Sequence, residues 1–158
     1  MSDVEDIKDV CLRLLARREH SRKELLNKCL VKGYGEHQVL AAIDGLVEQG
    51  LQDDLRYAES YARHRILKGY GPVFISYQLQ HQGVGAVDLD SIVETVAGSW
   101  MDVLGQVYSK KYRHSTSAKV CKDRHEWAKR SRFLMQRGFP AALVNALYVH
   151  LNSNNPKF

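Results

Sequence analysis

The sequence predicts an all-α protein built from three tandem three-helix repeats that stack into an elongated, curved array. Apolar residues recur at helical spacing along the chain, and no segment shows sustained apolar–polar alternation. An apolar residue also stands four positions before a glycine, and another six positions after it, at three places: Cys29–Gly33–Val39, Leu79–Gly83–Leu89 and Leu134–Gly138–Val144. Each unit predicts a helix, a glycine stop and a second helix.

The first repeat is expected to cover residues 1–50. Two Ser-x-x-Glu capping boxes, beginning at Ser2 and Ser21, predict the starts of its first two helices. The first helix is expected to extend to Arg18, and the third to begin at about Glu36. Glycines are expected to end helices throughout the chain: Gly33, Gly50, Gly69, Gly83, Gly98 and Gly138.

The second repeat is expected to cover residues 51–97. Either Asp53 or Asp54 has the side chain to cap its first helix. Gly71-Pro72 predicts the start of the next helix, since proline is well tolerated at the first helical position. The sixth helix is expected from about Ala86.

The third repeat is expected to cover residues 98–152, with residues 153–158 as a tail. Its first helix is predicted to start near Ser99. A basic helix is expected over residues 118–137, and the last helix is expected from Pro140.

Composition limits the function classes. The N-terminus is acidic and has no apolar signal-peptide core, and no apolar run reaches the ~20 residues of a membrane helix. Three cysteines without paired spacing argue against a disulfide framework. We therefore expect a cytoplasmic protein, with a monomer as the default for a capped array.

Charge is distributed unevenly among the repeats. The net charge is −1 over residues 1–50, −2 over 51–97 and +8 over 98–158. This asymmetry predicts a polyanionic or acidic partner for the third repeat. The candidate contact residues are the cations of that repeat and two from the fourth helix: Lys110, Lys111, Arg113, Lys119, Lys122, Arg124, Lys129, Arg130, Arg132, Arg137, Arg65 and Lys68.

Aromatic residues are interleaved with these cations, as on surfaces that stack nucleic-acid bases, although Trp127 and Phe133 equally fit a core. Tyr70 lies in a Gly-Tyr-Gly-Pro turn, which is either a fixed helix connection or a platform that displays the tyrosine.

Catalytic and metal-binding signals are weak. Cys121-x-x-x-His125 lacks the further ligands that zinc needs, and Ser21 already serves as a helix cap. We therefore expect no enzyme activity, no metal and no cofactor.

Several segments resemble the RecX regulatory protein family. Arg18-Glu19-His20-Ser21-Arg22-Lys23-Glu24-Leu25 and Gly50-Leu51-Gln52-Asp53-Asp54-Leu55-Arg56-Tyr57-Ala58 are similar to its first repeat and the start of its second. Lys68-Gly69-Tyr70-Gly71-Pro72 with Leu79 and Gly83 is similar to its second repeat, and Phe133-Leu134-Met135-Gln136-Arg137-Gly138-Phe139 to its third.

The resemblance implies a non-catalytic regulator that binds the RecA recombinase filament on single-stranded DNA. Such a protein inhibits the RecA ATPase, strand exchange and coprotease activities, and so modulates recombination, DNA repair and the SOS response. A helix-turn-helix regulator of duplex DNA remains the alternative, because short helix–glycine–helix units resemble that motif.

Overall fold

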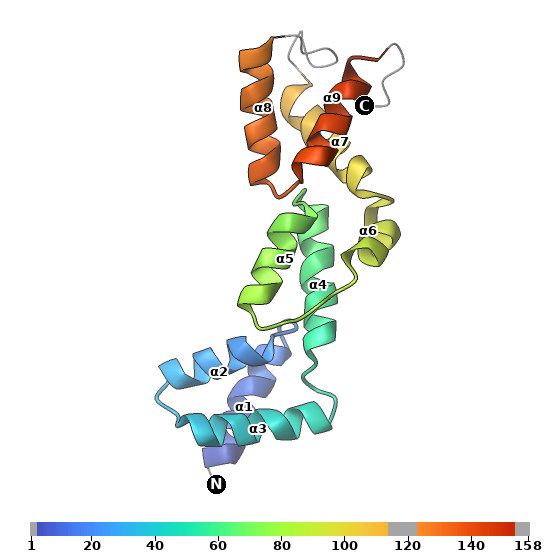
Figure 1. The fold of residues 1–158 in the computed structure, drawn as a ribbon. Coiled ribbons are helices and arrows are strands. Elements are labelled where there is room, and N and C mark those ends of the chain that lie inside the picture. Colours follow the sequence, from blue (N-terminus) through green and yellow to red (C-terminus); the bar gives the residue numbers. More distant parts are fainter. Residues whose placement is uncertain (1–2, 114–122, 154–158) are drawn as a thin grey trace. The chain divides into compact units, whose positions relative to one another are not determined.

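The computed structural model describes residues 3–113 and 123–153, which form nine α-helices and no strand (Figure 1). The helices, in chain order, are α1 Asp3–Leu15, α2 Arg22–Val31, α3 Glu36–Glu48, α4 Asp54–Leu67, α5 Pro72–His81, α6 Leu89–Ala97, α7 Trp100–Tyr112, α8 Arg124–Gln136 and α9 Ala141–Leu151. The predicted all-α class and the three groups of three helices are confirmed.

The predicted glycine stops are confirmed. All six glycines named from the sequence adopt positive φ. No other residue in the described part of the chain does so. The capping box at Ser21 is also present, with Glu24 N–H donating to Ser21 Oγ over 3.0 Å. Asp53, rather than Asp54, caps α4, because its Oδ1 accepts from the backbone N–H of Leu55 and Arg56.

Three predicted boundaries are wrong. Helix α1 ends at Leu15, so Arg18 lies beyond its last turn. Helix α6 begins at Leu89 because Asp88 is its N-cap, and α8 begins at Arg124 because Asp123 is its N-cap. The capping box expected at Ser2 and residues 118–122 of the expected basic helix fall outside the described residues.

The chain divides into two compact units, whose limits do not coincide with the repeat boundaries drawn from the sequence. Unit 1 is Met1–Tyr61 with Gln78–Val87, and unit 2 is Ala62–Tyr77 with Asp88–Phe158. The repeat limits at 50/51 and 97/98 therefore stay predictions.

Unit 1 has an apolar core between α1, α2 and α3. Its buried residues recur at helical spacing on each of these helices: Ile7, Val10, Cys11, Leu25, Cys29, Val39, Ala42, Ile43 and Leu46. Burying each large aliphatic side chain stabilises a fold by about 1.5–3 kcal/mol. Cys11 and Cys29 are core residues, as their positions on the apolar stripes predicted.

Within unit 2, backbone hydrogen bonds connect the turn between α4 and α5 to the turn that follows α8. Gly71 N–H donates to the Arg137 carbonyl over 2.8 Å, and Val73 N–H donates to the Gly138 carbonyl over 2.9 Å. A Cβ added at Gly71 would lie 2.5 Å from the Gly138 carbonyl atoms. The two backbones thus approach so closely that only glycine fits at Gly71.

Candidate partner-binding surface

The three acidic residues of the third repeat are used locally. Asp102 Oδ2 accepts from Ser99 Oγ over 2.9 Å at the start of α7. Asp123 Oδ1 accepts from the backbone N–H of His125 at the start of α8. Glu126 pairs with Arg130 at 3.1 Å. The acids therefore serve helix starts and one internal pair, and most of the repeat's positive charge is left unneutralised.

Most of the predicted contact residues are exposed. On α7 and α8, and at the end of α4, the exposed cations are Lys68, Lys110, Lys111, Arg113, Arg124, Lys129 and Arg132. Lys119 and Lys122 lie outside the described residues. The exposed cations of unit 2 thus come from several helices rather than from one recognition helix.

Arg130 is placed differently from its neighbours. Its side chain is buried, with only 2% of the residue exposed. Its Nη1 donates to Tyr108 Oη over 2.7 Å, and its guanidinium lies 4.3 Å from the centre of the Tyr112 ring. Arg130 therefore holds α8 against α7 and has no surface to offer a partner, so we remove it from the contact set.

Arg137 and Arg65 flank Tyr70 inside unit 2. The Arg137 guanidinium lies 4.4 Å from the Tyr70 ring centre, and its Nη2 donates to the Lys68 carbonyl over 3.0 Å. Arg65 lies 5.5 Å from the same ring, and Tyr70 stacks on Phe74. Tyr70 is thus part of a packed helix connection and is not displayed for a partner.

The aromatic residues of the third repeat pack against one another. Trp127 lies 4.8 Å from Tyr148 and 6.1 Å from Tyr108, measured between ring centres. Phe133 meets Tyr112 edge-on, and the Lys111 ammonium lies 3.9 Å from the Phe133 ring centre. Of the two interpretations left open by the sequence, the core interpretation holds for Trp127 and Phe133.

The sequence itself indicates that Arg130 and Arg137 lie on the packed face of the helix. Trp127, Arg130, Leu134 and Arg137 follow i, i+3, i+7, i+10 spacing, which places them on one helix face. Leu134 is fully buried. An arginine in register with such an apolar stripe belongs to the packed face, whereas Lys129 and Arg132 fall on the opposite side.

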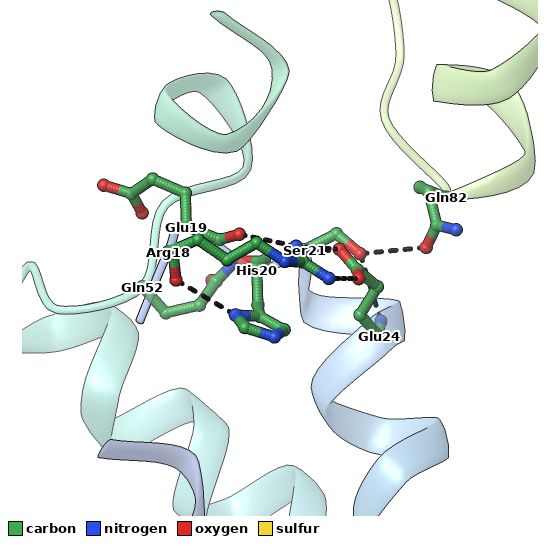
Figure 2. Close-up of polar contacts among 7 residues, drawn as sticks. All are labelled: Arg18, Glu19, His20, Ser21, Glu24, Gln52 and Gln82. Atoms are coloured by element: carbon green, nitrogen blue, oxygen red, sulfur yellow. Dashed lines mark hydrogen bonds and ion pairs between the residues drawn. The ribbon is translucent and has the colours of Figure 1, made fainter. Parts of the chain in front are cut away.

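Figure 2 shows the polar network around the segment that carries the family resemblance in the first repeat. Arg18 donates to both carboxylate oxygens of Glu24, at 2.6 and 3.3 Å, and Ser21 N–H donates to Glu24 Oε1. Burial raises the pKa of the Glu24 carboxyl, but the hydrogen bonds from Arg18 and Ser21 outweigh it and hold the pKa below its ordinary value. The network thus fixes the start of α2.

The same network joins other parts of unit 1. Ser21 Oγ donates to Gln82 Oε1 over 3.1 Å (Figure 2). Gln52 Nε2 donates to the His20 carbonyl and to Asp54 Oδ1. Since Ser21 and Gln52 are buried and hydrogen-bonded, they hold connecting segments together. A catalytic role for Ser21 finds no support in this arrangement.

The described residues offer little support for metal binding or for catalysis by a cysteine thiol. The described residues contain no cluster of three or more His, Cys, Asp or Glu side chains that could hold a metal ion. Cys121, which stands four residues before His125 in the sequence, lies outside the described part of the chain. Burial beside Cys29 raises the pKa of the Cys11 thiol to about 12, so this thiol is a poor nucleophile at neutral pH.

Within residues 3–113 and 123–153, no helix is long and apolar enough to cross a membrane.

These features define an all-helical repeat protein with a cationic surface. Comparison with known families identifies the particular family. Three RecX family models match in order: the first three-helix domain over residues 8–46, the second over 53–91 and the third over 101–147. The chain belongs to the RecX family of regulatory proteins.

Relatives and solved structures agree with this assignment. The regulatory protein RecX of Halorhodospira halophila is 37% identical over 90% of this chain and 86% of its own length. That of Pseudomonas syringae pv. tomato is 34% identical over 89% of this chain and 88% of its own length. The crystal structure of RecX from Lactobacillus salivarius has a TM-score of 0.71 at 21% identity, covering 95% of this chain and 97% of that one. A second RecX crystal structure has a TM-score of 0.73 at 22% identity, over 90% of this chain and 70% of that one. At these identities the structures support the fold.

Proposed function

We propose that this protein binds the RecA filament on single-stranded DNA and inhibits RecA ATP hydrolysis, strand exchange and coprotease activity. In doing so it modulates recombination, DNA repair and the SOS response. The observation that carries the proposal is the match of all three RecX domains in order along the chain.

The charge distribution supports a polyanionic target. Because residues 98–158 hold eleven Lys and Arg against three Asp and Glu, the exposed cations of the third repeat belong to a strongly positive segment. These side chains would meet DNA phosphates or acidic surfaces of filament subunits. Contacts that bridge neighbouring subunits would hinder the motions that accompany ATP turnover.

The test is the rate of ATP hydrolysis by RecA on single-stranded DNA as this protein is added. The proposal predicts a dose-dependent fall in rate that weakens as salt is raised, because phosphate and acidic contacts are screened. An unchanged ATPase rate at saturating protein and low salt would contradict the proposal.

A duplex-DNA regulator is the second candidate, and the cationic surface alone does not exclude it. Such a protein would bind specific duplex half-sites, usually as a dimer, through one recognition helix. Titrations of random single-stranded and duplex oligonucleotides, with and without RecA, separate the two functions. We expect the tightest binding where single-stranded DNA and RecA are both present, whereas RecA-independent preference for duplex DNA would favour the second candidate.

A further inference from the structure

Unit 2 contains a groove of about 610 Å³ between the end of α4, the exposed face of α7 and the end of α8. This volume lies within the ~300–1,000 Å³ typical of binding sites. Its charged lining is mostly cationic, with four basic residues and one acid: Lys68, Lys110, Lys111, Arg137 and Asp102. Aliphatic side chains, among them Leu67, Val103 and Val107, supply much of the remaining wall.

The cations of the groove have different roles. Arg137 is fixed by its hydrogen bond to the Lys68 carbonyl and by the Tyr70 ring, so its charge is held in place. Lys111 lies over the Phe133 ring. Lys68 and Lys110 are exposed at the rim. Asp102 is hydrogen-bonded to Ser99 at the start of α7. With four cations and one acid, the lining has a positive excess.

The lining does not suit a nucleic-acid base. Proteins that bind single strands combine basic grooves with aromatic faces on which bases stack. Among the described residues, Phe133 is the only aromatic one that lines this groove, and Lys111 lies over its ring while Tyr112 meets it edge-on. What the groove offers is positive charge beside aliphatic surface.

We propose that this groove binds an acidic peptide segment that carries aliphatic side chains and belongs to a protein partner. Carboxylates of the segment would pair with Lys68, Lys110 and Arg137, and its aliphatic side chains would pack on Leu67 and Val107. The identity of the partner as a RecA subunit rests on the proposed function. The chemistry of the segment rests on the groove alone.

The charge of the two sequence segments that adjoin the described residues of unit 2 does not complement the groove. The parts of the sequence next to unit 2's described residues, 114–122 and 154–158, contain Lys119, Lys122 and Lys157 and no Asp or Glu. Charge complementarity therefore points to a separate protein.

The experiment measures fluorescence anisotropy of a labelled peptide made of repeated Asp-Leu-Glu triplets, titrated with the full chain. The groove variant is Lys68→Gln/Lys110→Gln, and the matched control is Arg17→Gln/Lys32→Gln, which removes equal charge from exposed positions outside the groove. We expect the groove variant to weaken binding at least about tenfold and the control less than about twofold. Far-UV circular dichroism of both variants should match the parent, because all four side chains are exposed.

Two further probes identify the ligand class. A peptide of Asp-Ser-Glu triplets keeps the charge and loses the aliphatic surface, so it should bind more weakly than the Leu peptide. An oligothymidylate of equal charge should not compete better than the Leu peptide. Equal loss in the groove and control variants, equal binding of the Ser peptide, or stronger competition by the oligothymidylate would each overturn the proposal. These outcomes leave RecA inhibition by the parent protein untouched, so failure of the groove and failure of the proposed function are distinguishable.

Discussion

The first and third repeats each contain an arginine–glutamate pair, and the two pairs do different work. Arg18 and Glu24 meet near the surface, where they complete the capping of α2. Arg130 and Glu126 lie one turn apart on α8, and the Arg130 guanidinium is buried between Tyr108 and Tyr112. The first pair fixes a helix start, whereas the second is part of a helix–helix interface.

The comparison extends to the remaining charges. Residues 1–50 have a net charge of −1, and their charged side chains form the ion pairs Arg18–Glu24, Arg22–Asp44 and Arg56–Glu19. Residues 98–158 have a net charge of +8 and only three acids. In the first repeat, charges of both signs are available to pair during folding. In the third, Arg130 is buried, whereas several other cations among the described residues are exposed.

The largest expected effect is a loss of folding stability when the buried contact between α7 and α8 is changed. We predict that Arg130→Glu destabilises the protein by about 3–5 kcal/mol, because it buries a carboxylate beside Glu126 and removes the donor to Tyr108. Thermal unfolding followed by circular dichroism measures the loss. The adjacent, exposed Lys129→Glu is the control and should leave the melting temperature nearly unchanged. Equal melting temperatures for the two variants would show that Arg130 does not hold this interface.

A smaller effect is expected at the contact between the α4–α5 turn and the turn after α8. Gly71→Ala should destabilise by about 1–3 kcal/mol, since the added methyl group would overlap the Gly138 carbonyl. Gly85→Ala is the matched control, because a Cβ there meets nothing within 4 Å. Urea unfolding of both variants gives the difference, and a Gly71→Ala midpoint equal to that of the control would contradict the close approach.

The smallest effect is a pH dependence in unit 1. Burial, reinforced by the nearby Arg18 charge, lowers the pKa of His20 below its ordinary 6.5. The unfolded chain therefore binds a proton at a higher pH than the folded one, so stability is full above 6.5 and falls as pH drops below it. The melting temperature should decrease between pH 7.5 and 5.5, and His20→Asn should flatten that decrease. The exposed His37→Asn should keep the parent's slope, and a flattened slope there would remove His20 as the cause.

Much of the fold could be predicted because its signals are local. Glycine stops, the Ser21 capping box and the Gly71-Pro72 start each depend on residues a few positions apart, and the structure places them as expected. The end of α1 was not predictable in the same way. No glycine closely follows Leu15 in the sequence. Arg18 lies beyond the end of α1 and pairs with Glu24 across the turn between α1 and α2.

The candidate surface was harder to predict because charge alone does not say which way a side chain points. Lys129 and Arg132 are exposed, while Arg130 between them is buried and Arg137 packs on Tyr70. Helical spacing relative to Leu134 separates the two sets. The groove, in contrast, joins residues as distant as Lys68 and Arg137, and no sequence spacing indicates that they meet.

The most direct test of the account compares charge reversal in the two repeats in the RecA ATPase assay. Lys129→Glu/Arg132→Glu changes two exposed cations of the third repeat, and Arg17→Glu/Lys32→Glu changes two exposed cations of the first by the same charge. We predict that the third-repeat variant needs at least about tenfold more protein for half-inhibition and that the first-repeat variant stays within about twofold of the parent. Equal inhibition by both variants and the parent, with helicity retained, would contradict the claim that the third repeat carries the partner-binding surface.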